Sequence, residues 1–321
     1  MIARRTLLAA PVFLTAGGAS AQSSDAASYA AYLVTMRAEA RRAGVTQATI
    51  DRALRNPQLV QRAIDLDRHQ PESTLTWAQY RQRIVNDQRI ALGRTLYAKN
   101  RALLGQVSQR YGVEPGVVMG IWALESNYGA DSGKFPIVDC LATLAWEGRR
   151  RAFFQSELID ALKVLDRGDV TLERMVGSYA GAMGQTQFMP DSVLKYSVDY
   201  EGNGRRDLWN SLPDIFASTA NYLAREGWRS DLSWGRQIAL PAGFDVSQAG
   251  LAKRRPLAEW RRAGLSVPGV ADATVVAVVL PGGAGDESFV VYYPNYKALR
   301  SYNPPDKYCL SVGLLGDAIT A

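Results

Sequence analysis

The 321-residue chain is poor in the side chains on which most metalloenzymes and many hydrolases depend. It has one histidine, His69, and two cysteines, Cys140 and Cys309. This scarcity argues strongly against a zinc site and against a catalytic triad that uses histidine. We expect His69 to cap a helix or to pack. Both cysteines lie in apolar helical surroundings, where a disulfide between them and two buried thiols are equally open.

Long apolar stretches are also lacking, apart from one near the start. Arg4 and Arg5 precede an apolar run over residues 6–16, and Ala19-Ser20-Ala21 follows as a small-residue cleavage pattern. This order predicts a signal peptide over residues 1–21 and export to the periplasm, by the general route or the twin-arginine route. Nothing later approaches the roughly 20 apolar residues of a membrane-spanning helix. We therefore expect no transmembrane segment in the exported chain.

Strong charge of one sign is missing as well. The formal charge is +6, and removal of Arg4 and Arg5 lowers it to +4. The basic residues are scattered except at 149–151 and 253–255. Nucleic-acid binding thus has little support. A mildly basic exported protein suits anionic polymers of the cell envelope, although a solvated surface without a partner accounts for the charge equally well.

The apolar pattern predicts an α+β protein that is predominantly α-helical. Helical spacing dominates an N-terminal region, residues 22–110, and a core, residues 111–228, whereas residues 229–321 hold a small antiparallel β subdomain and two closing helices. The predicted helices include 137–146, 151–165, 212–225, 294–301 and 307–319, and the predicted strands are 237–240, 274–280 and 288–293.

One acid interrupts the most apolar of the predicted helices. Pro115 begins this helix and Gly129 is placed to end it, and the run between them is apolar on every side except at Glu125. A carboxylate at the helix end can reach solvent or pair with an arginine. Alternatively, apolar neighbours such as Trp122 keep the carboxyl protonated, which suits it to act as a general acid.

A second acid with supporting context is not evident. Asp131 and Asp139 have nothing convergent around them, and Glu147 lies beside three arginines with which it can pair. Glycoside cleavage commonly uses two carboxylates. Because no second carboxylate is evident, the sequence points to a reaction in which the substrate supplies the second group. Residues 177–190, "GSYAGAMGQTQFMP", add small residues and amides that can approach and hydrogen-bond a sugar.

The segment "DYEGNGRRDLWN", residues 199–210, follows the spacing of a calcium-binding loop. It lacks the bidentate glutamate at position twelve, so weak calcium binding and a metal-free turn closed by side-chain hydrogen bonds are both open. The candidate ligands, including one backbone carbonyl, are Asp199, Glu201, Asn203, Arg205 and Asn210.

Several of these motifs occur together in one known family. The chain resembles the membrane-bound lytic transglycosylase B family of murein-degrading enzymes, whose catalytic domain is similar to goose-type lysozyme. The motifs that carry the resemblance, in order, are "DRHQPE", "TWAQY", "GVEPGVVMGIWALESNYG", "LATLAWEGRRRAFF", "GSYAGAMGQTQFMPDSV", "DYEGNGRRDLW", "TANYL" and "SYNPPDKYCLSVGLL".

The resemblance implies a reaction without water. The β-1,4 bond between N-acetylmuramic acid and N-acetylglucosamine is cleaved while the muramyl 6-hydroxyl attacks the anomeric carbon, which gives a 1,6-anhydro product. Glu125 matches the single catalytic acid of the family. No cofactor is implied for the chemistry, calcium is a structural candidate, and glycan strands of peptidoglycan are the expected partner, with other cell-wall enzymes as further candidates.

The resemblance also implies substrate contacts, each assigned by position within a matching motif. They are Ser178 and Gln187 at the acetamido group, Tyr80 and Tyr222 as cleft aromatics, Arg149 and Arg150 opposite substrate carboxylates, and Tyr302, Asn303 and Tyr308 at the far wall. Two alternatives stay open: a hydrolytic muramidase, and a peptidoglycan-binding protein without activity.

Overall fold

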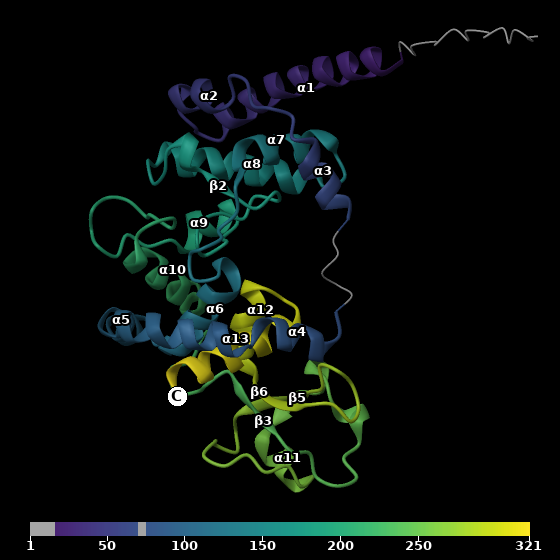
Figure 1. The fold of residues 1–321 in the computed structure, drawn as a ribbon, viewed down its shortest axis with the longest axis vertical. Coiled ribbons are helices and arrows are strands. Elements are labelled where there is room, and N and C mark those ends of the chain that lie inside the picture. The colour runs from purple at the N-terminus through teal and green to yellow at the C-terminus, as the bar shows by residue number, and fades with distance from the viewer. Residues whose placement is uncertain (1–16, 70–74) are drawn as a thin grey trace, which may run out of the picture.

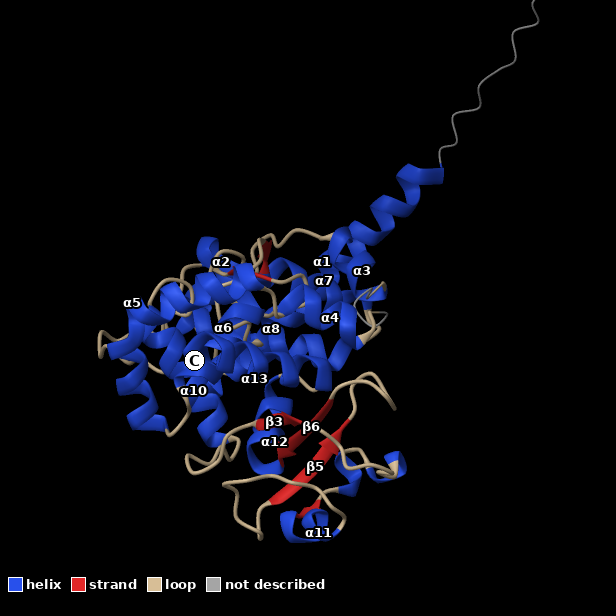
Figure 2. Ribbon diagram, turned by 60° about the horizontal axis from the view of Figure 1, so that its bottom comes forward, coloured by secondary structure: helices blue, strands red, loops and turns tan. Residues whose placement is uncertain are grey.

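The described part of the protein is predominantly α-helical with a small antiparallel sheet in its C-terminal third, as the sequence predicts, and it has a further two-stranded sheet (Figures 1 and 2). The computed structural model describes residues 17–69 and 75–321. Most of the predicted signal peptide, residues 1–16, lies outside this range. Within it, no helix combines the length and the apolar character that crossing a bilayer requires.

The helices form two stacked groups with the larger sheet below them in Figure 1. The upper group consists of α1 (Gly17–Arg42), α2 (Gln47–Ala53), α3 (Gln61–Arg68), α7 (Ile137–Glu147) and α8 (Arg151–Asp166). The middle of the molecule holds α4 (Trp77–Ile84), α5 (Asp87–Tyr111), α6 (Pro115–Ser126), α9 (Pro190–Tyr196), α10 (Leu212–Arg225), α12 (Tyr293–Tyr302) and α13 (Asp306–Thr320). Residues 22–110 are thus shared between both groups, and the predicted boundaries at 110 and 228 stay predictions.

The larger sheet lies in the C-terminal third of the chain. Its strand order is β3-β6-β5-β4 and all neighbours are antiparallel. The strands are β3 (Gly235–Ile238), β4 (Arg255–Pro256), β5 (Val275–Val279) and β6 (Ser288–Tyr292), with helix α11 (Leu257–Arg262) beside them. A two-stranded sheet, β1 (Phe135–Pro136) with β2 (Val176–Gly177), lies among the helices. The three strands predicted from the sequence correspond to β3, β5 and β6 within a few residues.

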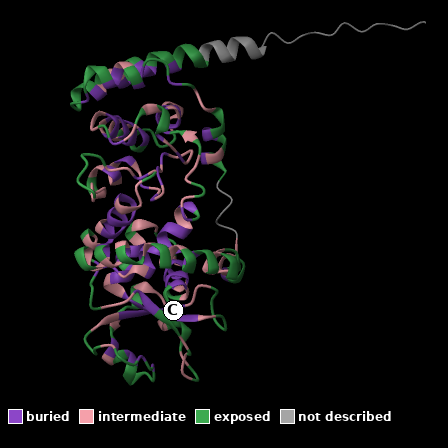
Figure 3. Cartoon of the chain, turned by 60° about the vertical axis from the view of Figure 1, so that its left-hand side comes forward, coloured by how far each residue is buried: buried purple, intermediate pink, exposed green. Residues whose placement is uncertain are grey.

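Helix α6 runs through the main core against α13. A Cβ atom at Gly120 would collide with the carbonyl oxygen of Val312, and one at Gly116 would lie 2.9 Å from the carbonyl oxygen of Gly316. Glycine at these two positions lets the two backbones approach closely. Most residues of the two helices are buried, and Figure 3 shows buried residues through the middle of the molecule. Helix α6 is therefore held rigidly where it delivers its last turn.

The end of α6 differs slightly from the prediction. Asn127, and not Gly129, is the C-cap, with φ 48° and ψ 51°. Tyr128 and Gly129 continue in the left-handed region with φ 59° and 83°. Asparagine tolerates this conformation because its short polar side chain can hydrogen-bond locally. The chain consequently turns sharply right after the helical turn that carries Glu125.

Cys140 and Cys309 are both buried and unlinked in the described structure. Burial raises the pKa of the Cys140 thiol to about 12. The disulfide alternative is therefore not the one adopted, and the two residues act as small apolar side chains in the core.

Candidate active site

Glu125 lies in the wall of a cavity of about 780 Å³. The cavity is bounded by α4, the start of α5, the end of α6, the segment after β2 and the start of α13, so segments far apart in sequence meet here. Its lining residues are Leu75, Tyr80, Arg83, Ile84, Arg89, Leu124, Glu125, Asn127, Asp131, Ser178, Gln187, Asn303 and Tyr308. Six of the ten predicted catalytic and substrate-binding residues are among them.

The carboxyl group of Glu125 is held by a tyrosine from α13. The Tyr308 hydroxyl donates a hydrogen bond of 2.5 Å to Oε1 of Glu125. Tyr308 is only 4% exposed, and its burial, followed by the nearby Glu125 charge, raises the pKa of the phenol well above its usual value. The phenol thus stays a hydrogen-bond donor at all physiological pH values. Glu125 itself is half-buried, with one side toward the cavity.

Residues around Glu125 fix the shape of the helix end. Trp122 donates its indole N–H to Gln185 at 2.7 Å, and Gln185 donates to the carbonyl of Trp209 at 2.7 Å. Ser126 donates to the Trp122 carbonyl and accepts the N–H of Gly129. Ser126 is buried, so it finishes the helix and does not face the cavity.

The glycine-rich segment contributes Ser178 and Gln187 to the cavity lining. The Ser178 hydroxyl accepts the N–H of Ala182 at 3.0 Å. Gln187 has φ 49°, a strained value for a residue other than glycine, and its amide donates to the carbonyls of Ser132 and Gly184, both at 2.9 Å. Such strain persists only where the surroundings impose it, and it is typical of binding sites.

A second cavity of about 890 Å³ continues from the first toward the sheet. Tyr80, Asn303 and Tyr308 line both cavities. The other lining residues of the second cavity come chiefly from the loops at residues 246–250 and 279–284 and from the start of α13. The groove that contains Glu125 is therefore longer than one sugar, and Tyr80 lies at the junction of its two parts.

Two of the predicted cleft aromatics lie behind the cavity instead of in it. The Tyr222 hydroxyl donates to the Ser301 carbonyl at 2.6 Å and that of Tyr302 to the Thr186 carbonyl at 2.7 Å. Their rings pack against each other and against Phe188, with centroids 4.8 to 5.5 Å apart. Neither lines the cavity. They support the segment that carries Gln187 from its buried side.

The predicted arginine pair also lies elsewhere. Arg149 forms an ion pair with Asp67 on α3 and donates to the Asp67 carbonyl at 2.8 Å. Arg150 stacks its guanidinium 4.2 Å from the ring centroid of Phe153. Neither residue lines the Glu125 cavity, and their contact with substrate carboxylates stays a prediction. The sequence could not reveal Asp67, because it lies 82 residues away and on another helix.

Two other arginines, which the sequence reasoning missed, do line the cavity. They are Arg83 on α4 and Arg89 on α5. A signal for Arg83 exists in the sequence, since it lies three residues after Tyr80 and residues at this spacing share a helix face. Arg89 is anchored by a 3.2 Å hydrogen bond to the Ile84 carbonyl. The cavity therefore has a positive wall, although not the expected one.

One of the acids considered from the sequence, Asp131, does lie at the cavity. Asp131 lines the same cavity as Glu125, and its Oδ1 accepts the N–H of Gly133 at 3.2 Å. Glu147, by contrast, pairs with Arg68, and Asp139 is partly buried on α7, where burial raises its pKa. Of the three acids considered from the sequence, only Asp131 reaches the cavity.

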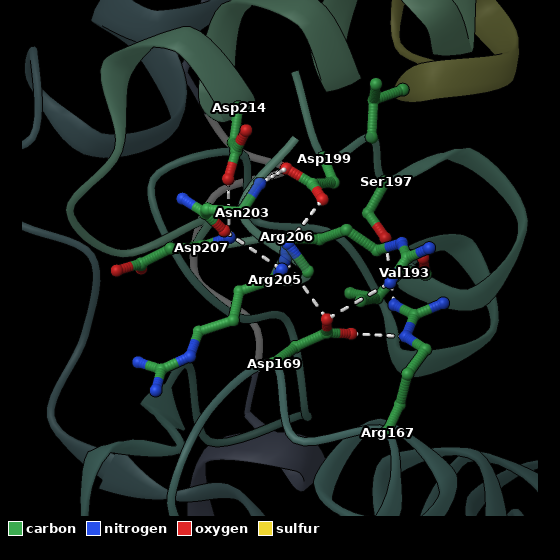
Figure 4. A network of polar contacts seen from close by, with 12 residues as sticks. Arg167, Asp169, Val193, Ser197, Asp199, Asn203, Arg205, Arg206, Asp207 and Asp214 are labelled. Atoms are coloured by element: carbon green, nitrogen blue, oxygen red, sulfur yellow. Dashed lines mark hydrogen bonds and ion pairs between the residues drawn. The ribbon is translucent and has the colours of Figure 1, made fainter. Parts of the chain in front are cut away.

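The calcium-loop-like segment holds itself together by hydrogen bonds (Figure 4). Asp199 accepts the backbone N–H groups of Asn203 and Gly204 at 3.0 and 2.7 Å. The Asn203 side chain in turn accepts the N–H of Arg205 at 3.0 Å. At position twelve, the side-chain amide N–H groups of Asn210 donate to Asp207. These are the contacts expected of the metal-free turn.

Two fully buried acids outside the predicted ligand set anchor this loop. Asp214 accepts the N–H groups of Tyr200 and Asp207, both at 2.8 Å. Asp169, which is 4% exposed, accepts the N–H of Arg206 at 3.0 Å and pairs with Arg167. Among residues 17–69 and 75–321, no group of three or more Asp, Glu, His or Cys side chains is placed to hold a metal ion. Calcium binding by the predicted ligands stays a prediction, and no chemical step depends on it.

Comparisons with known proteins agree with this architecture. The family model for the transglycosylase SLT domain matches residues 28–317. Membrane-bound lytic murein transglycosylase B of Escherichia coli K12 is 33% identical over 259 residues, which is 76% of this chain and 67% of that protein.

Solved structures show the same fold over nearly the whole chain. SltB3 from Pseudomonas aeruginosa in complex with NAG-NAM-pentapeptide is 39% identical with a TM-score of 0.88, over 91% of this chain and 80% of that one. The Escherichia coli lytic transglycosylase Slt35 in complex with calcium is 25% identical with a TM-score of 0.76, over 91% and 92%. The chain therefore belongs to the SLT-domain family of lytic murein transglycosylases.

Proposed function

We propose that this protein cleaves the β-1,4 bond between N-acetylmuramic acid and N-acetylglucosamine without water, with Glu125 as acid and then base. The single observation that carries this assignment is the position of Glu125 in the cavity wall, where its carboxyl group accepts a hydrogen bond from Tyr308. A carboxyl group so oriented can hand a proton to a glycosidic oxygen bound in the groove. No cofactor takes part.

The steps balance within the substrate and one side chain. Protonated Glu125 transfers its proton to the glycosidic oxygen as the bond to the anomeric carbon of the muramyl residue breaks. The acetamido oxygen of that residue stabilises the developing positive charge. Glu125, now ionised, accepts the proton of the muramyl 6-hydroxyl while this oxygen bonds to the anomeric carbon. The products are a 1,6-anhydromuramyl end and a free N-acetylglucosamine hydroxyl.

The other cavity residues have binding roles in this proposal. Ser178 and Gln187 hydrogen-bond the acetamido group, Tyr80 offers an aromatic face to a sugar, and Asn303 contacts the substrate at the junction of the two cavities. Tyr308 orients Glu125 through its hydrogen bond and also lines both cavities, where it can contact the substrate. The natural substrate in this proposal is peptidoglycan in the periplasm. The signal peptide predicted at residues 1–21 would export the chain to that compartment.

A hydrolytic muramidase is the second candidate, because Asp131 shares the cavity with Glu125. A second carboxylate can activate a water or stabilise the cation. Digestion of purified sacculi in heavy-oxygen water separates the two reactions. Our proposal predicts muramyl ends that are one water lighter than hydrolytic ends and contain no heavy oxygen. Labelled reducing ends, lost in Asp131→Asn, would establish hydrolysis instead.

A further inference from the structure

Helix α4 forms part of the groove wall but is short. It has eight residues, Trp77–Ile84, and begins with a capping box between Thr76 and Gln79. A helix of this length is not stable by itself and needs tertiary contacts. Tyr80, the residue that lines both cavities, is carried by this helix. The contacts that hold α4 therefore also set the position of the groove wall.

One acid next to the C-terminal sheet, Glu287, makes two polar contacts to α4. Glu287, which directly precedes β6, accepts the indole N–H of Trp77 through Oε2 at 2.7 Å. Its other oxygen forms an ion pair with Arg81. Oε1 also accepts a 3.3 Å hydrogen bond from Gln237 on β3. Glu287 thus joins α4 to β3 and to the start of β6, and Figure 1 shows α4 above the larger sheet.

The contact is partly sheltered from water. Trp77 is 1% exposed and packs edge-on against Phe289 of β6, with ring centroids 5.8 Å apart. The Glu287 side chain is 22% exposed and that of Arg81 36%. A charged acceptor is a strong partner for a buried indole N–H, and its loss leaves that donor unsatisfied. Just before the start of α4, the Leu75 carbonyl accepts a hydrogen bond from Lys307 of α13.

We propose that Glu287 is a positioning residue for substrate binding: by holding Trp77 and Arg81 it keeps α4 against the sheet and Tyr80 in the groove wall. The inference rests on the proposed function. Glu287 does not line the Glu125 cavity, so it acts on affinity through α4 and leaves the proton transfers unchanged.

Steady-state kinetics on soluble glycan fragments carrying NAG-NAM repeats test this role. We expect Glu287→Ala to raise KM about tenfold while kcat changes less than about threefold, since the loss is of binding geometry and not of acid strength. Trp77→Phe keeps the ring packing and removes only the N–H donor, so it should raise KM in the same way even if Glu287→Ala folds poorly. The double variant Arg81→Ala with Glu287→Ala should be no worse than Glu287→Ala alone, because both residues act through one contact.

The matched control is Asp272→Ala, which removes an acid that pairs with Arg261 in the same subdomain but away from α4. It should leave KM unchanged. Unchanged KM in folded Glu287→Ala and Trp77→Phe, or an equal rise in Asp272→Ala, would overturn the proposal. A wild-type protein that binds the fragments but does not cleave them would refute the proposed function alone, and calorimetric affinities of the same variants would still decide the role of Glu287.

Discussion

The groove around Glu125 and the loop at residues 199–210 both place acidic side chains where the sequence predicts function, but they use them differently. In the loop, the carboxylates of Asp199 and Asp207 accept nearby backbone and side-chain N–H groups. In the groove, Glu125 lines a cavity and accepts a hydrogen bond from the Tyr308 hydroxyl, which comes from the distant helix α13.

The difference shows that partners, and not residue type, decide what a carboxylate does. An acid that accepts several backbone N–H groups shapes a turn and stays ionised. An acid placed against a neutral phenol at a cavity wall is able to exchange a proton with a ligand.

Removing the acid in the groove should have the largest effect. Glu125→Gln keeps the size of the side chain and its contact with Tyr308 but cannot transfer a proton. We expect the rate of sacculus digestion to fall about 10³-fold or more, with binding of glycan fragments retained. Glu147→Gln, which alters an acid paired with Arg68 outside the cavity, is the control and should digest at the wild-type rate. Equal digestion by wild type and Glu125→Gln would show that Glu125 is not the catalytic acid.

Removing an anchor of the loop should instead cost stability. Asp214→Ala leaves the N–H groups of Tyr200 and Asp207 without their acceptor in a buried site. We expect the free energy of unfolding to fall by about 2–4 kcal/mol, measured by urea denaturation in the presence of a chelator. At a temperature where the variant is folded, its kcat should remain within about twofold of wild type. A large loss of kcat with normal stability would mean that the loop serves the reaction directly.

The phenol that holds Glu125 should have an intermediate effect. Tyr308→Phe removes one hydrogen bond to the carboxyl group and little volume. We expect kcat to fall about tenfold with KM nearly unchanged. Tyr296→Phe is the matched control, because Tyr296 is equally buried but donates to Asp306 at 3.1 Å. If the two variants have the same kcat, Tyr308 does not orient the acid.

Glu157 is a third kind of acid, a buried one, and it should make the free energy of unfolding depend on pH. Glu157 on α8 is 5% exposed and accepts the N–H of Asp191, and burial raises its pKa from 4.5 to about 7. Since the folded form holds the proton more tightly, the free energy of unfolding should decrease as pH rises from about 4.5 to about 7 and then level off. Glu157→Gln should flatten this dependence by about 1–2 kcal/mol between pH 5 and 8, measured by denaturation at each pH. An unchanged slope would mean that Glu157 is ionised throughout.

Much of the fold could be predicted from the sequence because its signals are local. Helices α7, α8, α10, α12 and α13 and strands β5 and β6 lie within about two residues of their predicted ranges, since their apolar spacing, prolines and glycines are enough to define them. The apolar surroundings of Glu125 likewise mark α6 as a core helix. Local sequence patterns were therefore sufficient to predict the position and type of these helices and strands.

The site was less predictable because its geometry depends on contacts between distant segments. Arg149 pairs with Asp67 across 82 residues, and Asp131 enters the cavity only because the chain turns sharply after Asn127. Tyr302 shares a motif with the lining residues Asn303 and Tyr308, yet its hydroxyl, like that of Tyr222, bonds to a backbone carbonyl behind the cavity. Sequence alone cannot fix which side of a packed layer such residues face. The support of α4 by Glu287 had no local signal at all.

The products of sacculus digestion by the wild-type enzyme in heavy-oxygen water test the central claim most directly. With Glu125 as the acid and the muramyl 6-hydroxyl as the nucleophile, mass spectrometry should find 1,6-anhydromuramyl ends without heavy oxygen, and Glu125→Gln should yield almost none of them. Reducing muramyl ends that carry heavy oxygen would contradict the account.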